Sequence, residues 1–367
     1  MPTEKKLRII HTEASPHWGG QEIRIFEEMK WFRKQGHEMI LVAPDNGTLY
    51  HRCNDAGFEV LSVYFTKPKM LLNLFKMLWI IWRKKPDVIA THSSTDSWSG
   101  LSAAYLMKIK KRVRYRHVCT KVSRNFYNRI QYSTLCNLII TTADCIKVNL
   151  SQDFKLKKVS TLPTPVNVPE LPSKMDSKNQ LTKHLCIPKD STLIGQLSVL
   201  RSWKGHELLI DAFSELLLIH KNLHLVFIGD GPHLNPITSK IKRLNLQKKI
   251  HLLGHCDDVW NKIRALDILT LASTQNEAIP QAIIQGMHAE VPVIGSDTGG
   301  IPELISHEET GLLFQSGNMN DLILCLTRLL SDKTLRENIS SNAKNYISLN
   351  YNWNKTGNIL LNHFYEN

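Results

Sequence analysis

The sequence predicts an α/β fold made of two doubly wound domains. Short apolar runs rich in β-branched residues alternate with segments of helical period along most of the chain, which is typical of parallel βαβ units. The alternation breaks once, at 163–172, where four prolines fall within ten residues. A chain of 367 residues is long for one such domain and comfortable for two of about 150 to 200 residues. We therefore expect two Rossmann-like lobes joined by a linker.

The first lobe is expected at 1–165. Strands are predicted at 7–11, 39–43, 59–63, 87–91, 113–117 and 138–142. An amphipathic stretch at 21–35, ended by Gly36, predicts the first crossover helix.

The second lobe is expected at 191–345, after a polar, proline-rich linker at 166–190. Strands are predicted at 192–197, 223–229, 250–253, 268–272 and 291–296, and helices at 204–219, 235–244, 258–265 and 280–287. The tail has two helical patterns with the aromatic anchors Trp353 and Phe364 and no strand. We expect its last part, 346–367, to be a helix that returns towards the first lobe across the hinge.

The positive charge is confined to the first half of the chain. Residues 1–170 hold 27 Lys and Arg against 14 Asp and Glu, whereas 171–367 hold 19 of each. This asymmetry indicates a polyanionic partner for the first half, either nucleic acid or an anionic membrane surface, unless it is only a solvated basic face. No aromatic platform interleaved with basic residues is present, so we expect no nucleic acid.

Nothing in the sequence predicts export or a membrane span. The start of the chain lacks a signal-peptide pattern, so we expect a cytoplasmic protein. The longest apolar run, 70–82, is too short to cross a bilayer, but it contains tryptophan and is flanked by lysines and arginines. We expect peripheral binding to the inner face of the cytoplasmic membrane. The alternative is that Leu71, Leu74, Phe75 and Leu78 form the core face of a crossover helix.

The cysteines predict neither a disulfide framework nor a metal site. The seven are scattered, odd in number and never spaced as Cys-x-x-Cys. The adjacent acidic pair Asp257 and Asp258 precedes a helix and is interpreted as its cap. We expect no metal.

Unusual residues follow the predicted strands, where two facing parallel sheets would line one cleft. Gly19 and Gly20 precede the first helix and could let backbone amides approach a phosphate, or could simply form a tight turn. Arg201 and Lys204 could neutralise a diphosphate, or could be solvated. Glu277 lies beside a predicted helix start, which pairs a carboxylate for a sugar hydroxyl with free amides for a diphosphate.

Several of these segments together resemble one known family. The stretch that begins Ser273-Thr-Gln-Asn-Glu, the run Val291-Pro-Val-Ile-Gly-Ser-Asp-Thr-Gly-Gly-Ile-Pro-Glu and Glu309-Thr-Gly-Leu-Leu-Phe resemble the donor-site signature of family-4 (group 1) glycosyltransferases of the GT-B fold. The first-loop glycines, Lys204-Gly and Gly229-Asp-Gly-Pro fall in the family's order, so the resemblance spans nearly the whole chain. It implies a retaining, metal-independent enzyme that uses a nucleotide sugar and needs no cofactor.

The resemblance also assigns roles to residues, with two departures. Glu277 matches the first glutamate of the family's Glu, seven residues, Glu motif, which contacts the donor sugar. The second position is Gln285, an amide where the family has a carboxylate for the ribose diol. The family's Gly-Arg-Leu is Gly-Gln-Leu here, with Gln196 at the arginine position, so we expect Arg201 to replace that arginine.

The remaining roles follow in the same way. Lys204 matches the family's lysine, and His117 falls where such enzymes place a histidine over the donor sugar. His92 is a further cleft candidate, or equally a buried structural histidine. The implied catalytic residues are His117, Glu277, Arg201 and Lys204. The implied donor-binding residues are Gly19, Gly20, Arg201, Lys204, Asn276, Glu277, Ala278, Ile279, Pro280, Gln281 and Gln285.

By analogy with the family, the acceptor is expected to be a glycan or lipid-linked glycan, as in lipopolysaccharide synthesis. The alternative enzyme on the same architecture is a sugar-nucleotide epimerase.

Overall fold

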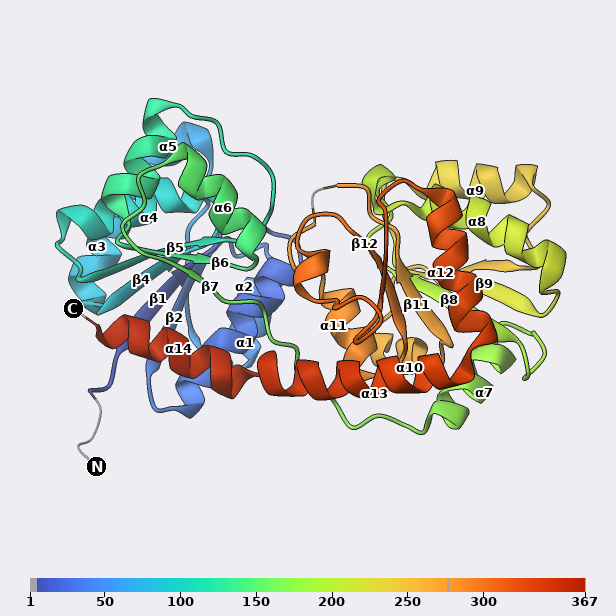
Figure 1. Cartoon of the computed structure of the whole chain (residues 1–367). Coiled ribbons are helices and arrows are strands. Elements are labelled where there is room, and N and C mark those ends of the chain that lie inside the picture. The colour runs from blue at the N-terminus through green and yellow to red at the C-terminus, as the bar shows by residue number, and fades with distance from the viewer. Residues whose placement is uncertain (1–4, 276, 367) are drawn as a thin grey trace. The chain divides into compact units, whose positions relative to one another are not determined.

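The computed structural model describes residues 5–275 and 277–366 (Figure 1). The chain divides into two compact units, one of residues 1–165 with 353–367 and the other of residues 166–352. Both units contain an all-parallel sheet with helices, in agreement with the predicted fold class.

The sheet of unit 1 has seven strands in the order β3-β2-β1-β4-β5-β6-β7. The strands are β1 Arg8–Thr12, β2 Glu38–Ala43, β3 Glu59–Ser62, β4 Val88–Thr91, β5 Lys111–Arg116, β6 Leu138–Thr141 and β7 Val159–Thr161. The strand order reverses between β1 and β4, which pair with Thr12 opposite Thr91. Ligands of doubly wound sheets bind at the carboxyl ends of the strands beside such a reversal. The ends of β1 and β4 are therefore the place to look for a site in this unit.

Seven α-helices accompany this sheet among the described residues. They are α1 Gly20–Lys34, α2 Thr48–Asp55, α3 Met70–Lys84, α4 Ser94–Leu106, α5 Phe126–Ile130, α6 Asp144–Asp153 and the C-terminal α14 Trp353–Tyr365. The last helix lies along α1 (Figure 1). The rings of Phe32 and Phe364 stack at 5.4 Å, and Trp31 Nε1 donates to Asn354 Oδ1 at 3.3 Å. Residues from the end of the chain thus complete the apolar core of unit 1.

The sheet of unit 2 has six strands in the order β10-β9-β8-β11-β12-β13. They are β8 Thr192–Leu197, β9 Leu223–Ile228, β10 Ile250–Leu252, β11 Ile268–Leu271, β12 Val293–Ser296 and β13 Leu312–Phe314. The helices are α7 Lys174–His184, α8 His206–Ile219, α9 Leu234–Arg243, α10 Val259–Arg264, α11 Gln281–His288, α12 Met319–Ser331 and α13 Lys333–Asn350. The strand order reverses between β8 and β11, which places their loops side by side.

Two features differ from the sequence-based expectation. The range 166–190, expected as a linker, holds helix α7. Ser173 caps this helix, and its side chain accepts a hydrogen bond from the Asp176 amide at 3.1 Å. The three-residue strands β7 and β13 were not expected, although the equally short β10 lies within the predicted range 250–253.

The predicted apolar segment of unit 1 forms helix α3. Its buried residues include Met77, Ile80 and Ile81, whereas Leu71 and Phe75 are 68% and 61% exposed. The interpretation of these two residues as a core face is therefore wrong. None of the helices formed by residues 5–275 and 277–366 combines the length and apolar character needed to cross a bilayer.

Candidate functional site

The loops after β8 and β11 bring two predicted residues of unit 2 into contact. The ammonium of Lys204 forms an ion pair with Oε1 of Glu277, and the hydroxyl of Ser273 donates to the same oxygen at 2.5 Å. The side chains of Lys204 and Glu277 are only 19% and 6% exposed. An ion pair with so little solvent is screened weakly, so each group holds the other in place.

Backbone contacts hold the two loops together. Gly205 has a φ of +70°, and a Cβ built there would lie 1.8 Å from the carbonyl oxygen of Ala272. Only glycine fits this position, because both the backbone conformation and the space exclude a side chain. The amide of Thr274 donates to the Trp203 carbonyl at 2.8 Å. The position of Lys204 is thus fixed against the end of β11.

The loop after β12 supports Glu277 from the other side. Gly299 has a φ of +60°, and a Cβ there would lie 2.1 Å from the carbonyl oxygen of Glu277. The amide of Gly300 donates to that same carbonyl at 3.2 Å. The Gly-Gly of the signature segment therefore positions the glutamate through its backbone.

Gln196, at the family's arginine position, and Arg201, expected to replace that arginine, lie in different environments. Gln196 is fully buried, and its amide nitrogen donates to the carbonyl of Lys204 at 2.8 Å. Its oxygen accepts from the amide of Ala272 at 3.4 Å, so the side chain ties together the loops that hold Lys204. Arg201 is exposed, and its guanidinium lies 5.0 Å from the centre of the Trp203 ring.

The other predicted donor residues of unit 2 lie at the start of α11. Ile279 and Pro280 are buried and Ala278 is half-buried, with Pro280 directly before the helix. Gln281 is the first helical residue, and the half-buried Gln285 lies about one turn further on. Asn276 lies outside the described residues.

In unit 1, Gly19 and Gly20 begin α1 in surroundings that contain two carboxylates. The Gly19 amide donates to Glu22 Oε2 at 3.0 Å, and burial together with the nearby Glu13 raises the pKa of Glu22. Glu13 itself accepts from the backbone amides of Ala14 and Ser15 and from the hydroxyl of Ser93. The first loop thus already satisfies several of its own amides with carboxylates.

His117, directly after β5, is the end member of a chain of imidazoles. Its Nε2 lies 2.9 Å from Nδ1 of His92, and Nε2 of His92 lies 2.9 Å from Nδ1 of His11. The ring planes are within 26° and 17° of parallel, with centroids 5.2 Å apart in both pairs. Burial lowers the pKa of all three, that of His11 to about 3. His92 is therefore both buried and in contact with the predicted catalytic histidine.

The inner end of this chain meets a buried ion pair. Oε1 of Glu28 lies 3.7 Å from Nε2 of His11 and accepts from the hydroxyl of Tyr115 at 2.5 Å. The Nε of Arg24 lies 3.5 Å from the other carboxylate oxygen, and the side chains of Arg24, Glu28 and His11 are fully buried. No local pattern predicts a role for His11, Arg24 or Glu28, because His11 lies on β1 whereas Arg24 and Glu28 lie on α1.

A second buried carboxyl, Asp96, lies at the reversal between β1 and β4. Its Oδ2 accepts from Thr12 Oγ1 at 2.5 Å and from the amide of His92 at 2.9 Å. Burial and the nearby Glu13 raise its pKa to about 7. The rule that functional side chains follow strands would have found Asp96, in the first turn after β4. Within the described residues, no three His, Cys, Asp or Glu side chains are grouped so as to hold a metal ion.

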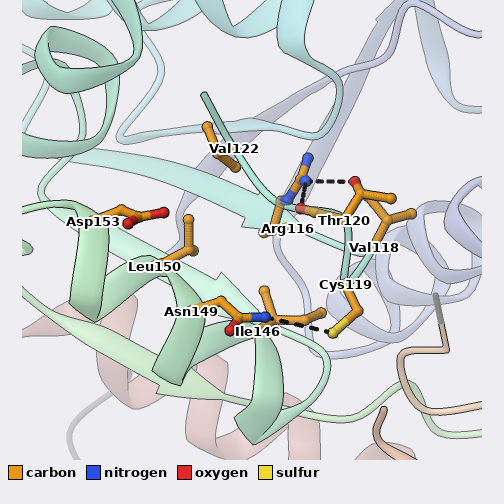
Figure 2. Close-up of a pocket in the computed structure, with 9 residues that line it drawn as sticks. All are labelled: Arg116, Val118, Cys119, Thr120, Val122, Ile146, Asn149, Leu150 and Asp153. Carbon is orange, nitrogen blue, oxygen red and sulfur yellow. Dashed lines mark hydrogen bonds between the residues drawn. The ribbon is translucent and has the colours of Figure 1, made fainter. Parts of the chain in front are cut away.

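A small pocket follows β5 (Figure 2). It lies between the loop after β5 and helix α6, and Arg116 closes part of it by donating to the carbonyl of Thr120 at 2.6 Å. Its volume is about 10 Å³, which is the space of roughly one water molecule. It is a packing gap and not a sugar site.

Both units match known family models. The group 1 glycosyl transferase model matches residues 177–346, and the glycosyltransferase family 4 model matches residues 18–169. The UDP-Gal:alpha-D-GlcNAc-diphosphoundecaprenol alpha-1,3-galactosyltransferase of Escherichia coli is 24% identical over 379 aligned positions, which cover 95% of this chain and 94% of that protein.

Solved structures share the fold over the full length. A glycosyltransferase of Rickettsia africae superimposes with a TM-score of 0.86 at 22% identity over 98% of both chains. Anabaena HepE in complex with UDP-glucose gives a TM-score of 0.85 at 18% identity, covering 97% of this chain and 99% of its own. With one family model on each unit, the chain belongs to the group 1, family 4 glycosyltransferases of the GT-B fold, which are retaining enzymes that use nucleotide-sugar donors.

Proposed function

We propose that this glycosyltransferase transfers a hexose from a nucleoside diphosphate sugar to a lipid-linked glycan, in lipopolysaccharide or related cell-surface polysaccharide synthesis. The single observation that carries the donor assignment is the Lys204–Glu277 ion pair at the strand reversal of unit 2. The Escherichia coli relative, whose name gives UDP-galactose as donor and a diphosphoundecaprenol-linked acceptor, supports the acceptor class.

The Lys204–Glu277 pair suits a sugar nucleotide because it offers both charges at one point. An ammonium has three donors, and the pair with Glu277 uses one, so two remain for phosphate oxygens. The Glu277 carboxylate can accept a hydroxyl of the donor sugar, and the first amides of α11 favour an anion. Arg201, exposed beside Trp203, supplies a second cation for the diphosphate.

In the proposed mechanism the acceptor attacks the sugar on the same face from which the diphosphate departs. The diphosphate oxygen then takes the proton of the acceptor hydroxyl, so the protein's task is to stabilise the developing negative charge. Lys204, Arg201 and the α11 amides supply this stabilisation, at about 3 kcal/mol for each well-placed donor.

His117 is proposed to act on the donor sugar and not on nucleotide binding. We expect His117→Ala to lower kcat by a factor of ten or more, while the Kd of the free nucleoside diphosphate changes within a few fold. Initial rates and calorimetry on one preparation measure both quantities. An alanine variant of full activity, or equal losses of affinity and rate, would contradict the proposed role.

A donor screen tests the substrate class directly. Thermal-shift measurements with UDP-, GDP- and ADP-hexoses at one common concentration should show the largest stabilisation with a UDP-hexose. When that concentration is a hundredfold above the Kd of the UDP-hexose, the stabilisation should be about 2.7 kcal/mol. Incubation of that donor without acceptor is the control for the epimerase alternative. A change of the sugar's configuration in this control would contradict sugar transfer as the reaction.

The exposed face of α3 is proposed to bind the inner surface of the cytoplasmic membrane. Large apolar side chains stand exposed along it, with Leu71, Phe75, Trp79 and Trp82 each more than half exposed. Six cations lie in or beside the helix, at positions 67, 69, 76, 83, 84 and 85, of which Lys84 is paired with Glu59. Amphipathic tryptophan-containing helices with flanking cations bind anionic lipid, at about 1 kcal/mol for each cation near the surface.

Vesicle flotation of the full chain tests this face. Binding to anionic vesicles should weaken at high salt and fall at least tenfold in the Phe75→Ser, Trp79→Ser double variant. The matched control is Leu218→Ser, Ile219→Ser, because these side chains are 68% and 77% exposed on α8 of unit 2. Equal losses in both double variants, or equal binding to neutral vesicles, would contradict the proposed membrane face.

A further inference from the structure

The imidazole chain of unit 1 contains two histidines, His92 and His11, that the proposed mechanism does not use. The proposed mechanism uses His117 alone, yet His92 and His11 continue the chain inward to Glu28, with 2.9 Å between nitrogens at both contacts. Hydrogen bonds between neutral imidazoles have a direction, because each ring has one N–H donor and one nitrogen acceptor. The state of the innermost ring therefore determines that of the outermost.

Each ring of the chain carries one proton at neutral pH. Burial lowers the pKa of His11 to about 3 and the pKa values of His92 and His117 well below their ordinary range. Two arrangements then satisfy both contacts: either every ring donates inward, from His117 towards Glu28, or every ring donates outward.

The charge of Glu28 selects between these arrangements. Burial raises the pKa of this carboxyl and Arg24 opposes the shift. Arg24 keeps its charge in proteins and is itself fully buried, so it requires the Glu28 carboxylate as counter-ion.

The ionised carboxylate faces His11. Its Oε1 lies 3.7 Å from His11 Nε2, which has no hydrogen-bond partner among the described residues. An N–H directed at the carboxylate is attracted to it, whereas a lone pair would be repelled.

We propose that His92 and His11 are positioning residues that fix the tautomer of His117. His11 directs its Nε2–H at Glu28, His92 donates its Nε2–H to His11 Nδ1, and His117 donates its Nε2–H to His92 Nδ1. Nδ1 of His117, for which the described part of the chain provides no hydrogen-bond partner, is thereby left as an acceptor. It would accept a hydroxyl of the donor sugar, and this last step rests on the proposed function.

Nuclear magnetic resonance of the full chain tests the tautomer without any activity. Long-range proton–nitrogen correlations on ¹⁵N-histidine protein distinguish protonated from unprotonated ring nitrogens, and His117→Asn assigns the signals. The inference expects a protonated Nε2 and an unprotonated Nδ1 at His117. The reverse pattern in the native chain would overturn it, even if the enzyme transfers sugar as proposed.

Variants at His92 test the positioning role. His92→Phe keeps a ring beside Tyr115 but has no ring nitrogens, so His117 should become a mixture of tautomers and kcat should fall about ten- to hundredfold at unchanged nucleotide affinity. His92→Gln can accept from His117 and donate to His11, so it should restore most of the tautomer and part of the rate.

The matched control is His224→Phe in unit 2, where His224 and His251 form a similar stacked, hydrogen-bonded pair on β9 and β10. It should leave kcat and the His117 signals unchanged. An unaltered His117 tautomer in His92→Phe would refute the positioning role. Full activity in His117→Ala, together with the expected tautomer in the native chain, would instead contradict the proposed function alone.

Discussion

Gly205→Ala tests whether backbone packing places Lys204 for its task. The alanine would adopt a φ of +70°, which costs about 1–2 kcal/mol, and its Cβ would overlap the Ala272 carbonyl oxygen at 1.8 Å. Such overlap adds about 1–3 kcal/mol through forced shifts of the surrounding backbone. The matched control is Gly254→Ala, with a φ of +67° and no atom within 4 Å of its Cβ. It carries the conformational cost alone.

The difference between the two variants isolates the close approach. At a central value of about 2 kcal/mol, Gly205→Ala should melt about 4–8 °C below Gly254→Ala, since 1 kcal/mol shifts Tm by about 2–4 °C in domains of this size. The displaced loop should also raise the KM for the nucleotide sugar in Gly205→Ala only. Differential scanning calorimetry and initial rates measure both effects. Equal melting temperatures, or equal KM values, would show that the contact with Ala272 does not fix Lys204.

Three further predictions concern the donor site of unit 2, and His11 and a cysteine pair of unit 1. Glu277→Gln should lower the transfer rate at least a hundredfold, about 3 kcal/mol, whereas Gln285→Glu should stay active with a lower donor KM; near-normal turnover of the first would refute the donor assignment. His11 has a pKa of about 3 when folded and about 6.5 when unfolded, so its contribution to stability is present above pH 6.5 and is lost as the pH falls. Between pH 8 and pH 5 the unfolding free energy of the native chain, measured with urea, should therefore fall by about 2 kcal/mol more than that of His11→Phe. An equal fall in the two proteins would contradict this. Oxidised glutathione should join Cys119 and Cys145, whose sulfurs lie 3.1 Å apart, with loss of two hydrogen masses in the intact protein; an unchanged mass, or the same loss in Cys145→Ser, would refute the pairing.

The fold was predictable because its central strands are long, apolar and β-branched. Strands Glu38–Ala43 and Leu223–Ile228 are buried and have few polar interruptions, so the sequence alone is enough to predict them. Strands β7 and β13 have three residues each and exist because a neighbouring strand offers its free edge. Neither was predicted, whereas the equally short edge strand β10 was predicted from the apolar run at 250–253.

The candidate site was only partly predictable for a related reason. Glu277 and Lys204 each stood out beside a predicted strand end, but 73 positions separate them, and only the sheet topology brings them together. In the sequence, Gln196 stands where the family has an arginine, which indicates only a lost cation. In the structure, its side chain donates a hydrogen bond to the carbonyl of Lys204 and so holds the loop that carries this lysine. Glu28 lies within a helix pattern and gave no signal, because its partner His11 lies on a strand.

The C-terminal helix α14 has a consequence for biosynthesis. Its residues Trp353, Leu360 and Phe364 belong to the same apolar core as Phe32, although all of unit 2 separates them along the chain. During translation, residues 166–352 leave the ribosome before α14 does, and domains generally fold as units as they emerge. Unit 2 can therefore reach its final structure while the surface of α1 that receives α14 is still uncovered. A nascent chain stalled before residue 353 should expose this apolar surface and bind holdase chaperones, and release of the last helix should end that binding.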